Sequence, residues 1–244
     1  MKKILLLALL IAGSASAQDS LPGHIQRGFS LSPISRKVSR VDGWVLGVGH
    51  YRSKLIERQT VNGLNTEVSP TGAAFVLAGI VRVMYLSKRG EIPIIDSLPA
   101  AAPTFIRVNG INISTGGFME EGAEVRGLNL STATLLNRMQ GVSVSALAVG
   151  AVRVDGLSIS PLSSIRQLNG GSISLTNSAR EVRGAQIGFL NMSRELRGLQ
   201  LGAINSARSS RYGFQIGLIN RTHRGFQLGL LNINKKRVLP LLNW

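Results

Sequence analysis

Apolar and polar residues alternate in short runs that recur along most of the chain. In the last clear run, Phe226, Leu228 and Leu230 fall on one face of an extended segment, and Gln227 and Gly229 fall on the other. A period of two over five to eight residues is typical of a half-buried β-strand. Ile, Val and Leu at the apolar positions favour the same structure.

Eleven of these runs align on a glycine and share the consensus apolar-polar-Gly-apolar-(Asn/Ser/Gln)-apolar-(Ser/Gly). From Gly110 onward the steps between aligned glycines are 17, 14, 15, 14, 14, 14, 15 and 12 residues. Late copies extend the consensus to G-x-Q-x-G-x-x-N. The pattern therefore predicts a tandem repeat protein. We call the aligned glycines the repeat glycines: Gly43, Gly63, Gly110, Gly127, Gly141, Gly156, Gly170, Gly184, Gly198, Gly213 and Gly225.

The residue before each repeat glycine predicts the kind of turn. Five copies carry Asn or Asp at this position, and Asn-Gly or Asp-Gly favours the type I′ turn of a β-hairpin. Later copies carry Arg-Gly or Tyr-Gly, which suits a type II turn with glycine at positive φ. The apolar phase also changes across Gly184, between Val182 and Ala185, as a turn or bulge requires.

The expected fold class is therefore all-β, with tandem repeats of about 14 residues. We favour an antiparallel barrel or petal-like ring built from these repeats. The alternative is a β-solenoid in which recurring Asn and Gln side chains stack in ladders. Against the solenoid, the links at 193–195 and 208–211 are polar and supply no second buried face.

The N-terminus has the three parts of a signal peptide. Lys2 and Lys3 precede an apolar run over residues 4–12, and Ala15-Ser16-Ala17 forms a small-x-small cleavage site. We expect a signal peptide over residues 1–17, an N-terminal lead over 18–40 and a single β-repeat domain over 41–244. The expected location is the outer membrane or periplasm of a Gram-negative bacterium.

One segment interrupts the repeats, at about residues 69–104. It contains an apolar stretch over residues 73–86 with Arg82 as its one charged residue, followed by a stretch rich in Pro and Ala. Such an insertion is either a plug, a lid or a membrane-touching loop, or an ordinary core segment with a surface loop. An insertion in a repeat array is a natural place for a binding site.

The charge balance favours anionic partners. The chain has 28 Lys and Arg against 12 Asp and Glu, and removal of Lys2 and Lys3 leaves 26 against 12, a net charge of +14. Anionic lipid, lipopolysaccharide or an envelope protein fits this surplus, and export makes nucleic acid an unfavoured partner. The alternative is a solvated rim of turns. The candidate anionic-ligand rim comprises Arg194, Arg197, Arg208, Arg211, Arg221 and Arg224.

No catalytic, cofactor-binding or metal-binding constellation stands out. The chain has no cysteine, and His24, His50 and His223 lack metal-ligand spacing, so each is expected at the surface or in a turn. The acidic cluster of Glu120, Glu121 and Glu124 fits solvated side chains on one segment. We therefore expect no enzyme activity and no cofactor.

The C-terminal part resembles a known family. Its tandem G-x-Q-x-G-x-x-N units and the closing Leu239-Pro240-Leu241-Leu242-Asn243-Trp244 are similar to those of exported bacterial surface-repeat proteins. The resemblance covers roughly residues 41–68 and 105–244, and it extends more distantly to the glycine-spaced hairpins of MORN repeats. It implies an envelope address and an all-β repeat fold, but no activity, cofactor or site residue.

Two functions are consistent with these patterns. The first is a non-enzymatic cell-envelope scaffold or binding protein. The alternative is a small outer-membrane β-barrel with a pore or transport role, because one strand face is aliphatic and the chain ends in Trp244.

Overall fold

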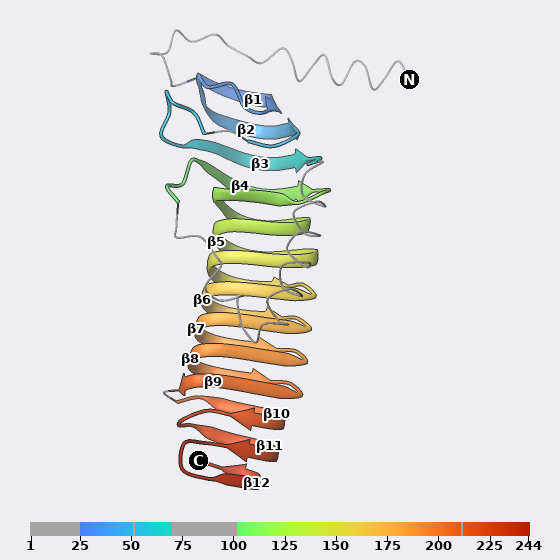
Figure 1. Ribbon diagram of the computed structural model, residues 1–244. Coiled ribbons are helices and arrows are strands. Elements are labelled where there is room, and N and C mark those ends of the chain that lie inside the picture. Colours follow the sequence, from blue (N-terminus) through green and yellow to red (C-terminus); the bar gives the residue numbers. More distant parts are fainter. Residues whose placement is uncertain (1–24, 51, 70–101, 211) are drawn as a thin grey trace, which may run out of the picture.

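The computed structural model describes residues 25–50, 52–69, 102–210 and 212–244, and it shows a tall stack of parallel coils (Figure 1). Twelve strands form one sheet in which neighbours follow the order of the chain. The strands are β1 (Ile25–Ser32), β2 (Val38–Gly47), β3 (Gln59–Glu67), β4 (Ile106–Ser114), β5 (Phe118–Ile159), β6 (Leu162–Ile173), β7 (Thr176–Ile187), β8 (Leu190–Leu201), β9 (Ile204–Ser210), β10 (Phe214–Arg221), β11 (Phe226–Ile233) and β12 (Val238–Asn243). The long β5 runs through three successive repeats.

This topology is a β-solenoid, so the alternative fold prediction is confirmed and the favoured antiparallel barrel or petal-like ring is wrong. Successive strands from β1 to β11 pair in parallel. The register aligns equivalent repeat positions, as in Gly63 with Gly110 and Asn65 with Asn112. Parallel, in-register stacking places identical side chains one above another, which lets amides bond between coils.

Nine of the eleven repeat glycines lie within strands β2 to β8, and they do not form the predicted hairpin turns. Ten of the eleven have positive φ, and Gly213 is replaced in this role by Tyr212, with φ 61°. Gly198 shows why glycine is needed, because its φ is 142° and a Cβ there would lie 2.0 Å from the carbonyl oxygen of Gly184. Both the backbone conformation and the close approach of the coils exclude other residues.

The structure also contains a repeat copy that the sequence alignment missed. In β1, Phe29 and Leu31 are in register with Trp44 and Leu46 of the first recognised copy. A Cβ on Gly43 would lie 2.1 Å from the carbonyl oxygen of Gly28, so Gly28 belongs to the glycine column. The step from Gly28 to Gly43 is 15 residues, close to the later steps. The solenoid therefore begins within the expected 18–40 lead.

The coil interior has a polar half. The residue two places after each repeat glycine from Gly63 onward is a buried Asn, Ser or Gln, and we call this series the amide column. Late coils add a second column of buried Asn seven places after the glycine. The amide column is Asn65, Asn112, Asn129, Ser143, Ser158, Ser172, Gln186, Gln200, Gln215 and Gln227, and the second column is Asn177, Asn191, Asn205, Asn220 and Asn232.

Hydrogen bonds between coils connect these side chains. Asn65 Nδ2 donates to Asn112 Oδ1 at 2.7 Å, and Gln215 Nε2 donates to Gln200 Oε1 at 2.7 Å. In the second column, Asn191 Nδ2 donates to Asn205 Oδ1 at 2.8 Å. Most of these amides both donate and accept, so burial leaves few unsatisfied polar atoms; Gln227 Oε1 and the Ser158 hydroxyl are the exceptions within the amide column. The expected Asn and Gln ladders are confirmed.

The polar half of the strand is therefore the buried half. Gln227 is fully buried, whereas Phe226, Leu228 and Leu230 on the opposite face are exposed. A half-buried strand was expected, but the alternation alone does not determine which face points inward. Cooperative amide ladders are available only inside the stack, where the identical side chains meet in register.

The other half of the coil interior is aliphatic. The residue two places before each repeat glycine is buried and apolar through Gly198, and we call this series the aliphatic column. Buried Ser193 and Ala207, on the links before the repeat glycines, pack on the same side of the interior. The expectation that the polar links supply no second buried face is therefore wrong. Alternation along these links sends every second side chain inward. The aliphatic column is Val41, Val61, Val108, Val125, Met139, Val154, Leu168, Val182 and Leu196.

The C-terminal strand closes the stack in the opposite direction. β12 pairs antiparallel with β11, and Pro240 within it has no backbone N–H to offer a further strand. Arg237 Nη2 donates to the Trp244 carbonyl oxygen at 2.9 Å, and its guanidinium lies 4.6 Å from the centre of the Trp244 ring. Asn243 Nδ2 donates to the Asn232 carbonyl oxygen at 3.1 Å. The Asn243 bond and the strand pairing join β12 to the last coil, and the Arg237 contacts brace the C-terminal segment itself.

Candidate functional site

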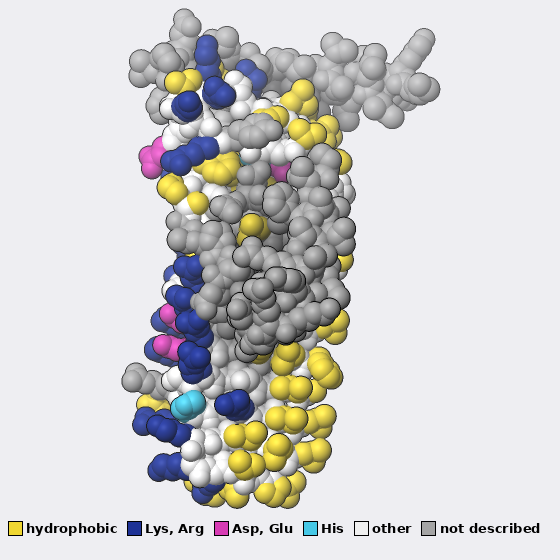
Figure 2. Space-filling view, in the orientation of Figure 1, with side chains coloured by type: hydrophobic (Ala, Val, Ile, Leu, Met, Phe, Trp, Pro, Cys, Tyr) yellow, Lys and Arg dark blue, Asp and Glu magenta, His cyan; other side chains and the backbone are white. Residues whose placement is uncertain are grey.

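Exposed hydrophobic side chains line one side of the stack (Figure 2). They occupy the positions one, three, five and six residues after the repeat glycines, which we call the apolar edge. None of the 44 residues at these positions in the eleven copies is charged. Of 31 exposed large hydrophobic residues in the described chain, 25 lie at these positions or in register with them on β1. The exposure is therefore a continuous feature of the coil and not a scatter of single residues.

The apolar edge is most pronounced in the last coils. Phe189, Leu218 and Leu230 lie five places after their repeat glycines, and each exposes more than half of its surface. Leu218 and Leu230 are neighbours in the register of β10 and β11. The rings of Phe214 and Phe226 lie 5.8 Å apart on the same edge. This edge covers the part of the interior that holds the amide column.

Lys and Arg side chains gather along the other side of the stack (Figure 2). In the C-terminal coils they lie mainly on the links that precede the repeat glycines, outside the aliphatic column. We call this set the arginine edge: Arg180, Arg183, Arg194, Arg197, Arg208, Arg221 and Arg224. Residues 162–244 contain twelve Lys and Arg but only two acidic residues, Glu181 and Glu195.

Part of the predicted rim is brought together by the register of the coils. Arg194 and Arg208 occupy equivalent places on β8 and β9, because Ser193 pairs with Ala207 and Glu195 with Ser209. Arg197 pairs with Arg183 of the preceding coil. Neighbouring coils are about 4.8 Å apart, so each pair stacks like charges at close range.

The remaining rim residues are less regularly placed. Arg221 ends β10 and Arg224 precedes β11, so both flank the link between these strands, and both are exposed. Arg211 lies outside the described residues. Glu181 and Glu195 lie 3.8 Å from Arg183 and Arg197, respectively. The arginine edge has seven arginines against these two carboxylates, so its net charge stays positive.

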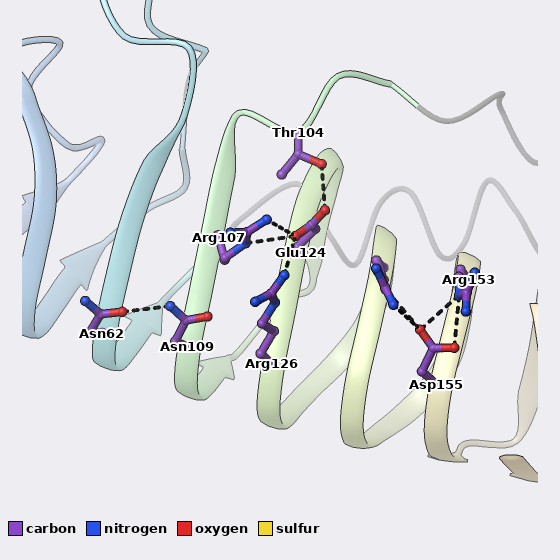
Figure 3. Close-up of polar contacts among 9 residues, drawn as sticks. Asn62, Thr104, Arg107, Asn109, Glu124, Arg126, Arg153 and Asp155 are labelled. Atoms are coloured by element: carbon purple, nitrogen blue, oxygen red, sulfur yellow. Dashed lines mark hydrogen bonds and ion pairs between the residues drawn. The ribbon is translucent and has the colours of Figure 1, made fainter. Parts of the chain in front are cut away.

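In the earlier coils, carboxylates pair with neighbouring arginines. Arg138 Nη2 lies 2.7 Å and Arg153 Nε lies 2.9 Å from Asp155 Oδ2 (Figure 3). Asn169 Nδ2 donates to Asp155 Oδ1 at 2.7 Å. Burial raises the pKa of Asp155, but the hydrogen bonds from Asn169, Arg138 and Arg153 outweigh it and hold this pKa below its ordinary value.

A second cluster surrounds Glu124. This carboxylate accepts hydrogen bonds from Thr104 Oγ1 at 3.1 Å and from Arg107 Nε at 2.9 Å (Figure 3). Burial raises the pKa of Glu124, whereas the bonds from Arg107 and Thr104 lower it, and the balance lies below the ordinary value. Glu124 is therefore a paired structural carboxylate, and the side chains of Glu120 and Glu121 lie outside the described residues.

A buried pair ends the amide column at the N-terminal side. His50 Nε2 lies 2.5 Å from Glu67 Oε1, and both side chains are buried. Asn65 Nδ2 also donates to Glu67 Oε1, at 2.9 Å. The expectation of a surface histidine is thus wrong for His50. Because Val45 occupies the next place in the column, the pair provides the first amide with polar neighbours where the column stops.

Within the described ranges, no three His, Cys, Asp or Glu side chains gather in a way that could hold a metal ion. Nor does any helix there have the length and apolarity needed to cross a membrane. The predicted signal peptide and nearly all of the predicted 69–104 insertion lie outside the described residues, as does His24. His223 is exposed in the link before β11, as expected.

The chain was compared with models of protein families, with curated proteins and with solved structures, and none of them matches. Sequence reasoning identified the rim arginines from their recurrence in the links, but it missed the apolar edge. The signal for that edge was present, because Asn and Gln recur at fixed positions opposite the apolar residues. The two edges are the features from which a function is inferred.

Proposed function

We propose that this chain is a non-enzymatic scaffold of the bacterial cell envelope that binds phosphate-bearing lipids along its arginine edge. The solenoid supplies a rigid frame, and the repeat places equivalent side chains at equal intervals. The observation that carries the proposal is the stacking of Arg183 with Arg197 and of Arg194 with Arg208. An anionic surface or lipopolysaccharide presents several phosphates at once, and a row of guanidinium groups fits such a target.

The charge distribution supports a binding role for the C-terminal coils. Asp155 pairs with Arg138 and Arg153, and Glu124 pairs with Arg107. Residues 162–244, by contrast, have twelve basic residues against two acidic ones. Arginine forms bidentate bonds with phosphate and remains charged at every physiological pH. A localised surplus of this kind attracts anionic surfaces over roughly a Debye length, about 8 Å at physiological ionic strength.

The experiment compares two triple variants with equal change of net charge. The first replaces Arg197, Arg208 and Arg224 with Ser, and the matched control replaces Arg36, Lys37 and Lys54 with Ser near the N-terminal end; all six side chains are exposed. Binding is measured by cosedimentation with phosphatidylcholine vesicles, with and without lipid A or phosphatidylglycerol. At about 1 kcal/mol per basic residue, the first variant should lose roughly 100-fold in affinity.

The control should bind anionic vesicles nearly as well as the parent chain, and raised salt should release the parent chain. Equal losses in both variants would mean that net charge alone attracts the lipid, and absence of binding would refute the proposal. Binding to lipid A vesicles only, and not to phosphatidylglycerol vesicles, would identify lipopolysaccharide as the source of the phosphates.

The envelope address rests on the N-terminal sequence and is tested separately. Expression of the full chain in a Gram-negative host should yield a product that begins at Gln18, as read by intact mass. Fractionation should then recover it with the periplasm or the outer membrane. A cytoplasmic product that retains Met1 would contradict the address.

A further inference from the structure

The apolar edge has no role in phosphate binding, and it is too extensive for a bare protein surface. Ten steps separate Gly43 from Gly225, so at about 4.8 Å per coil this edge is about 50 Å long. Its width spans one inter-sheet spacing of about 10 Å and two residues of strand, which gives roughly 800 Å². Exposed apolar patches of more than a few hundred Å² mark interaction sites.

We propose that a second copy of this chain covers the apolar edge, so that the protein is a dimer with its two arginine edges facing outward. Roughly 800 Å² per copy is the area that a standard protein interface contributes from each partner. The edge is uncharged along its whole length, which matches the depletion of charge at the centre of interfaces. A flat face of aliphatic side chains with the aromatic pair Phe214 and Phe226 can pack against its own equivalent.

The charge distribution suits a second copy as the occupant. The apolar and arginine edges centre on opposite sides of the coil (Figure 2), and their nearest members, such as Arg224 and Phe226, are two residues apart across a repeat glycine. Two copies that meet at their apolar edges would therefore bring uncharged positions together at the centre and leave the arginines of both copies at the rim and beyond it. Interfaces commonly combine an apolar centre with a polar rim in which Arg is enriched.

A lipid bilayer is the other occupant to test, because interfacial segments that enter lipid carry cationic residues beside their apolar face, as Arg224 lies beside Phe226. The area of the edge and its uncharged centre favour a second copy, and the vesicle arm of the test below detects lipid.

The first test measures the mass of the purified chain by sedimentation velocity between about 1 and 100 µM. We expect a dimer for the parent chain and a monomer for the double variant Leu218→Lys with Leu230→Lys. These two side chains are exposed neighbours, so the variant should fold normally, as checked by circular dichroism. Two unpaired charges in the interface should raise the dissociation constant by at least about 100-fold.

A matched control adds the same charge on the other side of the coil. Ser209→Lys with His223→Lys changes two exposed residues near the arginine edge, and it should leave the dimer intact. A monomeric parent chain at 100 µM, or a dimer that resists the lysines at Leu218 and Leu230, would overturn the proposal. So would a monomer that binds neutral phosphatidylcholine vesicles through the apolar edge, because the occupant would then be lipid.

The absence of cysteine allows a second, independent test. A single cysteine at Phe189, on the apolar edge, should form an intermolecular disulfide under mild oxidation, whereas one at Ser209, on the opposite side, should not. Equal cross-linking at both sites would indicate random collision and contradict the proposed dimer. Lipid binding at the arginine edge is scored separately, so either proposal can fail without the other.

Discussion

The two sides of each coil differ in which side chains they bury and which they expose to solvent. On the arginine side, charged residues face solvent and the aliphatic column fills the interior, as in an ordinary globular protein. On the apolar side, hydrophobic residues face outward and hydrogen-bonded amides fill the interior. The comparison teaches that a buried polar ladder can replace a hydrophobic core where identical coils stack in register, which leaves the apolar residues free for another surface.

The repeat glycine separates the two halves of the coil, and its replacement should have the largest effect. In Gly198→Ala, the new Cβ would meet the Gly184 carbonyl oxygen at 2.0 Å and the residue would be held at φ 142°. We expect a loss of about 3–5 kcal/mol in the free energy of unfolding, measured by urea denaturation. Gly171→Ala is the control, because its Cβ meets only the end of Leu157 at 3.1 Å and should cost less than about 1 kcal/mol.

The amide column is tested by an apolar side chain of similar size. Gln200→Met would remove the acceptor of one Gln215 N–H and the donor to Gln186 Oε1, while Gln215 Nε2 keeps its bond to the Arg221 carbonyl oxygen. We expect a loss of about 2–4 kcal/mol in unfolding free energy, because each unsatisfied group costs about 1–3 kcal/mol. Gln167→Met, a partly exposed position outside the column, should cost less than about 1 kcal/mol. Equal stability of the two variants would show that the ladder contributes nothing beyond packing.

The arginine side should depend on pH, through Asp155. The pKa of Asp155 is lower in the folded chain than its ordinary value of 3.8. Its pairing therefore stabilises the fold above about pH 4 and is lost as the pH falls through the folded-state pKa. Asp155→Asn should lower the free energy of unfolding by about 1 kcal/mol at pH 7. The difference between variant and parent should shrink at pH 3, and a difference that grows at low pH would contradict this assignment.

The smallest effect is expected on the apolar edge itself. Leu230→Ala removes an exposed side chain and should change the unfolding free energy of the monomer by no more than about 0.5 kcal/mol. Leu196→Ala, in the aliphatic column, should cost about 2–5 kcal/mol and provides the contrast. Both are measured by thermal unfolding at a concentration low enough to keep the chain monomeric. A large loss for Leu230→Ala would mean that the apolar residues support the coil.

The repeat, its strands and its glycine positions could be predicted from the sequence, because each produces a local pattern that recurs at regular spacing. The inward face could not, since Gln227 and Phe226 alternate equally well with either one buried. Strand direction was also hidden, because Asp-Gly and Asn-Gly at Asp42 and Asn62 are hairpin signals in isolation. Only the register of Gly43 on Gly63 shows that close packing between coils is the reason for glycine.

The candidate functional site was also only partly predictable from the sequence. The rim arginines could be found because Arg recurs in the links, and five of the six lie in the described residues. Their stacking in pairs depends on the distance between coils, which the sequence does not specify. The apolar edge was misjudged for the same reason as the inward face: a hydrophobic residue on a strand is usually a buried one.

The antiparallel strand β12 allows the number of upstream coils to vary without change at the last coil. Because β12 closes the final coil, units inserted or deleted upstream of β11 leave that end unchanged. Each added 14-residue unit would lengthen the rod by about 4.8 Å and extend both edges by one more step. Duplication or loss of single units would therefore change the length of the solenoid while its last coil and β12 stay the same.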